Sequence, residues 1–197
     1  MNRLLVIIIF IRTMYPFSLM NKYIEQYDKS NNILTLKWKL VNYTFDINKN
    51  ELLDIIRKSL DIWSSQLYIP YCESFFLRFK EVSENEDFSI MWCDIPDTEN
   101  KIILARTDYL ERVCINNLVN WTTEFSLQYV LTHEIGHILG LGHSSYKNSV
   151  MNEEYKNIKD ISLSIDDRCA ILWNYIGPSR TCLYILINTE LYNKYIQ

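Results

Sequence analysis

The sequence predicts an α+β domain in which a helix crosses a mixed β-sheet and two further helices follow toward the C-terminus. Alternating apolar and polar residues recur in several short segments between residues 33 and 116, a period typical of half-buried strands. Apolar residues recur at helical spacing in three other segments, which follow or contain capping residues. The chain has 197 residues, of which 48% are hydrophobic and 22% charged, so it can form one globular domain with a buried core.

Five strands are expected, in two longer and three shorter segments. Residues 33–41 and 75–82 alternate apolar with polar side chains over most of their length. Residues 88–92, 102–107 and 112–116 are shorter segments of strand-forming residues. A helical segment separates the first strand from the others, which indicates a mixed sheet with a helix across it.

The first two helices are predicted from their caps. Residues 48–65 form the first, since Asn48 is a good capping residue and Glu51 stands three positions on. Residues 125–139 form the second, and Gly140 then occupies the position where helices often end in a left-handed conformation.

The third helix is predicted over residues 164–176. Ser164 and Asp167 form an acidic capping box at its start, and Gly177 followed by a proline ends it. The remaining residues, 179–197, are expected to be a tail with no clear partner.

Charge and length bear on the class of protein. The net charge is −4 without a long basic run, so nucleic-acid binding is not expected. The apolar run of residues 4–11 is shorter than the ~20 residues that span a membrane. Because Arg3 precedes this run, residues 1–20 are predicted as a secretory signal peptide and the protein as secreted. Residues 21–32 are expected to be a short N-terminal segment of the mature protein. The protein is expected to be a monomer.

The five cysteines stand at positions 72, 93, 114, 169 and 182, and none has the C-x-x-C spacing of a zinc or redox site. In an oxidising compartment they allow at most two disulfides and leave one thiol over.

All three histidines of the chain lie within eleven residues, from His133 to His143. Four residues advance an α-helix by about 400°, so His133 and His137 lie on one face, one turn apart. Two imidazoles in this arrangement can bind a single Zn²⁺.

The residues around this pair predict a catalytic metal site. Glu134 is rotated about 100° from His133, where a general base for a metal-bound water belongs. Gly140 ends the helix and Gly142 adds backbone freedom, so His143 can return as a third ligand. Three protein ligands leave one open position, and water bound there has a pKa lowered toward ~7.

The full spacing H-E-x-x-H-x-x-G-x-x-H is the zinc signature of the metzincins, which a downstream Met-turn completes. Met151, eight residues after His143, is predicted to be that methionine. Ser144 directly after the third histidine, residues 34–44 and residues 163–167 resemble the corresponding segments of the matrixins, the family of the matrix metalloproteinases.

The resemblance covers residues 33–178, which are therefore expected to be a matrixin-like catalytic domain followed by the tail of residues 179–197. It implies a metzincin-like fold: a twisted mixed sheet with two long helices, a zinc cleft, and a small C-terminal subdomain with the third helix. It also implies a zinc endopeptidase that cleaves extracellular proteins, with protein inhibitors as partners.

The resemblance further implies roles for residues near the zinc ligands. The segment Leu104-Ala-Arg-Thr107 corresponds to the family's L-A-H-A edge strand, against which the substrate binds as an added strand. Main-chain groups of Leu104 and Ala105 are expected to hold the substrate. Tyr155, at the end of the segment after Met151, is expected to wall the specificity pocket.

The departures from the family concern its other metals and its latency. Arg106 and Cys114 stand where the family has histidine ligands of a structural zinc, and residues 116–119 lack its acidic calcium cluster. One catalytic Zn²⁺ is therefore expected, without those structural zinc and calcium sites. The inhibitory motif P-R-C-G-x-P-D does not occur, so latency of that kind is not expected.

Two other functions stay open at this point. The chain could be a metzincin of another branch with a different substrate. It could also be a catalytically inactive, zinc-bound module that holds a peptide in its groove, although such a module has no need for Glu134.

Overall fold

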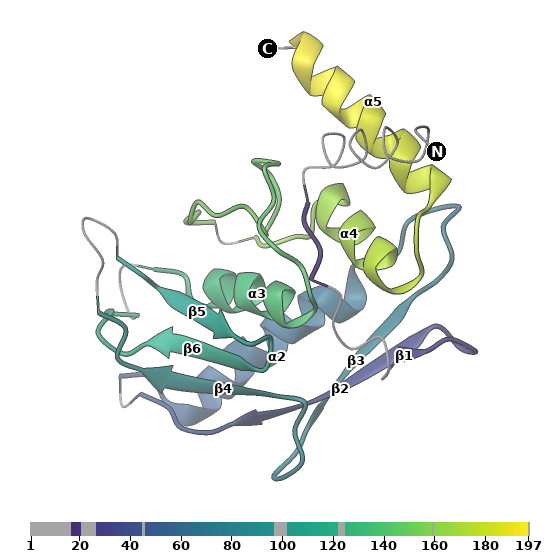
Figure 1. Cartoon of the computed structure of the whole chain (residues 1–197). Coiled ribbons are helices and arrows are strands. Elements are labelled where there is room, and N and C mark those ends of the chain that lie inside the picture. The colour runs from purple at the N-terminus through teal and green to yellow at the C-terminus, as the bar shows by residue number, and fades with distance from the viewer. Residues whose placement is uncertain are drawn as a thin grey trace, which may run out of the picture.

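The computed structural model describes residues 17–20, 27–44, 46–96, 102–121, 125–158 and 160–196, and from residue 189 onward only the backbone. Most of the predicted signal peptide, residues 1–16, lies outside the described residues. Within them the chain forms one six-stranded sheet and four helices, which confirms the α+β class (Figure 1).

The sheet is assembled around β2 (Ile33–Leu40), whose alternating side chains are buried at Leu34, Leu36 and Trp38. β2 pairs in parallel with β3 (Phe76–Glu81) and with β4 (Phe88–Cys93), and Trp38 has a strand partner on each side. The two-residue β1 pairs antiparallel with the start of β2.

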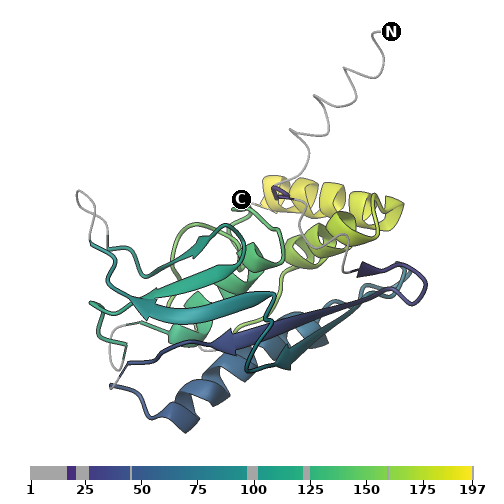
Figure 2. The ribbon, with the colours of Figure 1, turned by 60° about the horizontal axis from the view of Figure 1, so that its bottom comes forward.

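The other half of the sheet ends in an antiparallel edge strand. β6 (Arg112–Asn116) pairs in parallel with β4, and β5 (Ala105–Asp108) pairs antiparallel with β6 at the end of the strand order. β5 begins three residues later than the predicted segment 102–107. Figure 2 shows how strongly the sheet twists, since the long dark-blue strand β2 runs at an angle to the teal strands above it.

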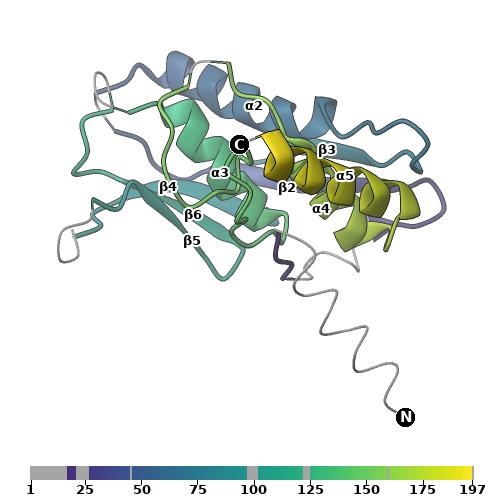
Figure 3. The ribbon, with the colours of Figure 1, turned by 90° about the horizontal axis from the view of Figure 1, so that it is seen from above.

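The helices α2 (Lys49–Ser65) and α3 (Leu127–Ile138) lie on the same side of the strands β4, β5 and β6 (Figure 3). The Asn48 side chain caps α2 as predicted, and Ser126 caps α3 by accepting the amide of Tyr129. Trp63 of α2 is fully buried, and its indole N–H donates to the Thr132 carbonyl of α3 over 2.8 Å. This buried hydrogen bond fixes the position of α2 against α3.

The third predicted helix is α4 (Ile165–Tyr175), and its capping box between Ser164 and Asp167 is present in both directions. Gly177 follows with a φ of 110°, as a helix-ending glycine does.

The predicted tail instead contains a helix, α5 (Arg180–Ile196), which lies beside α4 above the sheet in Figure 1. Cys182 of α5 is buried and forms a disulfide with Cys169 of α4, so this segment does have a partner. A second disulfide joins Cys93 of β4 to Cys114 of β6, and Cys72 is free. This agrees with the expectation of two bridges and one thiol. None of the described helices is sufficiently long and apolar to cross a membrane.

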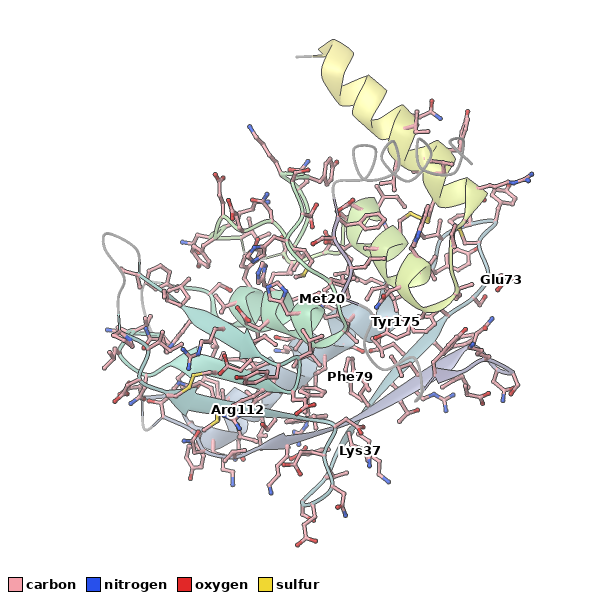
Figure 4. All side chains as sticks on the ribbon, viewed as in Figure 1. Met20, Lys37, Glu73, Phe79, Arg112 and Tyr175 are labelled. Atoms are coloured by element: carbon pink, nitrogen blue, oxygen red, sulfur yellow. A yellow bond between two sulfur atoms is a disulfide. The ribbon has the colours of Figure 1, made fainter. Side chains whose placement is uncertain are left out.

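A short N-terminal segment runs along the end of α3. The amide of Met20, labelled in Figure 4, donates to the Gly140 carbonyl over 2.7 Å, and the amide of Gly142 donates to the Ser18 carbonyl over 2.8 Å. Leu19 and Leu141 form an antiparallel bridge between these two bonds. The loop that leads to His143 is thus paired with a second stretch of chain.

Candidate functional site

The three histidines converge at the C-terminal end of α3. His133 and His137 project from adjacent turns of the helix, and His143 returns from the loop that follows it. One potential ligand atom from each of the three lies within 4.8 Å of the other two. Among the described residues no other group of three or more His, Cys, Asp or Glu side chains comes together in this way.

Two main-chain carbonyls orient the first two rings. His133 Nδ1 lies 2.7 Å from the Val150 carbonyl oxygen, and His137 Nδ1 lies 2.7 Å from the Leu141 carbonyl oxygen. A carbonyl can only accept, so each Nδ1 carries the proton and each Nε2 has a free lone pair. This is the outer hydrogen bonding that metal-bound histidines usually have.

The surroundings also keep the rings neutral, which metal binding requires. Burial, helped by the charge that His137 would carry, lowers the pKa of His133 to about 3. Burial also lowers the pKa of His137. Three imidazole nitrogens at this spacing fit one Zn²⁺ and leave room for a further ligand.

Glu134 lies beside the histidines and is only 6% exposed. Burial raises the pKa of its carboxyl to about 7, against the opposing effect of a hydrogen bond from Thr107. That bond joins Thr107 Oγ1 to Glu134 Oε2 over 2.7 Å. A carboxyl with a pKa near neutrality is suited to accept and return a proton.

The glycines in the signature have distinct roles. Gly140 has a φ of 84° and ends α3 in the left-handed conformation, as predicted. Gly142 is not in that conformation; it is needed for space, because a Cβ there would overlap the Ser18 side chain. A Cβ on Gly136 would overlap the sulfur of Met151.

Met151 lies beneath α3 and is 1% exposed. Its turn is held by Asp167 at the start of α4, whose carboxylate accepts from the Ser149 hydroxyl and from the amides of Val150 (3.0 Å) and Met151 (3.3 Å). Because the Val150 carbonyl in turn orients His133, the α4 N-terminus and the metal centre are connected through this turn.

A cleft of about 650 Å³ opens next to the histidines. The predicted substrate residues Leu104, Ala105 and Tyr155 all line it, together with His133 and Glu134. The structure therefore brings three separate segments of the chain to one cavity.

Asn152, Glu153 and Glu154, from the predicted wall segment after Met151, also line the cleft. Two further lining residues, Tyr129 and Val130, were not predicted from the sequence. A signal for Tyr129 was present, since it precedes His133 by four residues and so lies on the same face of α3.

Two tyrosines shape this wall of the cleft. Tyr129 is 2% exposed, burial raises its pKa to about 12, and its hydroxyl has no hydrogen-bond partner among the described residues. Tyr155 packs edge-on against Tyr129, and its hydroxyl accepts the Ser126 amide over 2.6 Å. This wall of the cleft is therefore aromatic, with a buried hydroxyl.

Comparison with known proteins adds an independent line of argument. A family model described as Matrixin matches residues 26–176. Matrix metalloproteinase-B of Caenorhabditis elegans is 31% identical, with 82% of this chain and 38% of the relative covered. Stromelysin-3 of Xenopus laevis is 30% identical, with 78% and 33% covered, and matrilysin of Rattus norvegicus is 30% identical, with 70% and 55% covered. This chain thus spans less than two thirds of the length of these relatives.

Proposed function

The chain belongs to the matrixin family, and from this premise we propose that it is a zinc endopeptidase that hydrolyses peptide bonds of protein substrates. The observation that carries the proposal is the convergence of three histidines, two of them oriented by main-chain carbonyls, beside a buried glutamate at a cleft. An inactive binding module would gain nothing from burying that carboxyl, since desolvating it costs stability.

In the proposed site, His133, His137 and His143 hold one Zn²⁺ through their free ring nitrogens. When bound, the ion supplies a Lewis acid that polarises a peptide carbonyl and lowers the pKa of water toward ~7. Cys114, which stands at one family ligand position for a second zinc, is in a disulfide with Cys93 and offers no thiolate. This supports a single zinc per chain.

Glu134 is the proposed general base. Its carboxylate takes a proton from the attacking water and then passes it to the amine that leaves when the peptide bond breaks. The pKa of about 7 allows both halves of this exchange near neutral pH.

We propose that the substrate binds as an added strand along β5. The Leu104 carbonyl already accepts the Asn116 amide over 3.0 Å, so Leu104 directs its main chain toward β6. Main-chain groups alternate in an antiparallel ladder, and Ala105 then directs its N–H and C=O toward the open edge. Ala105 is therefore the stronger candidate to hold the substrate main chain, with Leu104 as part of the wall.

Tyr155 would wall the specificity pocket, as the resemblance implies. Glu153 and Glu154 are both exposed at the cleft. Their charge should disfavour acidic substrate side chains nearby. Enrichment of acidic residues after the cleaved bond in a peptide-library profile would contradict this.

A secreted protein is the proposed setting for this activity. The leader-like N-terminal sequence and two disulfides between described residues both fit an oxidising compartment. Recovery of the protein from the medium of expressing cells, rather than from the cells, is the expected result.

The proposal is tested by comparing wild type with Glu134→Ala in a proteome-wide digest. We expect peptide cleavage to collapse in Glu134→Ala, by about 10²-fold or more, while one zinc per chain stays bound by metal analysis. Unchanged cleavage would favour another mechanism, and equal inactivity of both proteins would favour the binding module. Two zincs per chain, or tightly bound calcium, would contradict the single-ion site.

A further inference from the structure

Thr107 lies on the edge strand of the sheet, facing the helix that carries the metal ligands. Side chains alternate along β5, so Ala105 and Thr107 share one face while Arg106 and Asp108 share the other. The ion pair between Arg106 and Asp108 (3.3 Å) agrees with this alternation. Thr107 is half-buried between β5 and α3.

The Thr107 hydroxyl makes two contacts, both with Glu134. Its oxygen lies 2.7 Å from Glu134 Oε2 and 3.2 Å from the Glu134 main-chain carbonyl. A carbonyl oxygen and an ionised carboxylate are both acceptors only. The Thr107 hydroxyl therefore donates its one proton to Glu134. The shorter and charge-assisted contact is the one to the carboxylate.

This hydroxyl is the one side-chain group that hydrogen-bonds the Glu134 carboxylate among the residues the structure describes. Glutamate has several rotatable bonds and would otherwise sample many orientations, whereas threonine is stiff about χ1. One carboxylate oxygen is thereby held, and the other is left available for proton transfer.

The contact is a feature of this chain. Thr107 stands at the last position of the segment that corresponds to the family's L-A-H-A strand, where alanine has no hydroxyl. We propose that Thr107 is a positioning residue for the proposed general base, and that its hydroxyl fixes the Glu134 carboxylate in the orientation needed for proton transfer. This inference rests on the proposed peptidase function.

The test compares Thr107→Val, which removes the hydroxyl and keeps the shape, with Thr107→Ser, which keeps the hydroxyl. We expect Thr107→Val to lower kcat about tenfold with KM and zinc content unchanged, because the lost bond orients a group that acts only in the chemical step. Thr107→Ser should restore most of the wild-type kcat. Thr35→Val is a matched control, since Thr35 is an exposed strand residue on β2.

A second readout does not depend on activity. In zinc-loaded protein with ¹³C-labelled glutamate, the Glu134 carboxyl resonance can be assigned by its loss in Glu134→Ala. We expect Thr107→Val to shift this resonance, and Thr107→Ser to return it toward the wild-type position.

The outcomes separate the two proposals. A wild-type kcat in Thr107→Val, an equal loss in Thr107→Ser, or an unmoved Glu134 resonance would overturn the positioning role while leaving the peptidase intact. If the wild type cleaves no peptide, the proposed function fails, and the resonance still decides whether Thr107 holds Glu134.

Discussion

Gly136 shows how one residue of the signature is dictated by its neighbours. Glycine inside a helix is ordinarily about 1 kcal/mol less favourable than alanine. At Gly136, however, an added Cβ would overlap the sulfur of Met151 and come within 2.9 Å of the Trp63 ring. The helix therefore accepts a poor helix former so that the Met151 turn can pack directly beneath it.

We expect Gly136→Ala to destabilise the protein by about 1–3 kcal/mol, although helix propensity alone would make it stabilising. The free energy of unfolding, measured by urea denaturation, gives the sign. Repeating the substitution in a Met151→Ala background is the control, since the overlap with the sulfur is then absent and the cost should fall to what the Trp63 ring contact still imposes. A stabilising effect of Gly136→Ala in the wild-type background would show that the Met151 side chain moves aside at little cost.

At the scale of elements, the start of α4 supports the metal centre from a distance in the sequence. Asp167 accepts hydrogen bonds from the turn of residues 149–151, and the Val150 carbonyl of that turn orients His133. The same carboxylate also completes the capping box with Ser164. The buried Asp167 thus caps its own helix and also holds the turn whose carbonyl orients His133.

Asp167→Ala should weaken zinc binding about 10- to 100-fold, because the carbonyl that orients His133 is no longer held in place. It should also lower the free energy of unfolding by about 3 kcal/mol, since several buried donors lose their acceptor. Competition with a chelator of known affinity measures the first effect.

Ser164→Ala is the matched control for Asp167→Ala. It removes part of the same capping box, at a cost of about 1 kcal/mol, but leaves the bonds to the Met151 turn. If both variants lower zinc affinity equally, the effect belongs to the helix cap and not to the turn.

The last helix, α5, was not predicted from its local sequence pattern. Residues 180–196 are helical, and Cys182 bonds to Cys169, but the sequence pattern alone had indicated only a tail. The pairing partner lies 13 residues earlier, in another helix. Five cysteines without a known spacing motif do not reveal which pairs are formed.

At the scale of the whole molecule, the proposed base is expected to cost stability when no metal is bound. Folding raises the pKa of Glu134 from 4.5 to about 7, so the folded state binds this proton more tightly than the unfolded state. The stabilisation of the fold by this proton is fully present below pH 4.5 and is lost as pH rises through 7. His133 behaves in the opposite way: its pKa falls from 6.5 to about 3, and its contribution is lost as pH falls below 6.5.

Metal-free Glu134→Gln should therefore be more stable than the metal-free wild type at pH 8, by about 3 kcal/mol. The difference should shrink as pH falls through 7 and approach zero below pH 4.5, where the carboxyl is mostly protonated in both states. The histidine contributions are common to both proteins and cancel in the comparison. Urea unfolding in a chelating buffer at pH 8 and at pH 4.5 measures the difference in the free energy of unfolding between the two proteins. An equal difference at both pH values would contradict the raised pKa of Glu134.

The sequence by itself determined the metal ligands and most of the helices and strands. His133 and His137 are four residues apart on one helix, and Gly140 ends that helix before His143, so local geometry brings the three together. The alternation in residues 33–40 and the capping box at Ser164 are likewise local signals, and both were confirmed.

Only the tertiary structure decided which distant residues complete the site. Thr107 meets Glu134 across 27 residues, the Val150 carbonyl meets His133 across 17, and Ser18 fills the space beside Gly142. Periodicity and capping act over a few residues, so they determine which face of a helix or strand is buried. They do not determine which face of another element packs against it, because that depends on the twist of the sheet and on the fit of side chains in the folded core.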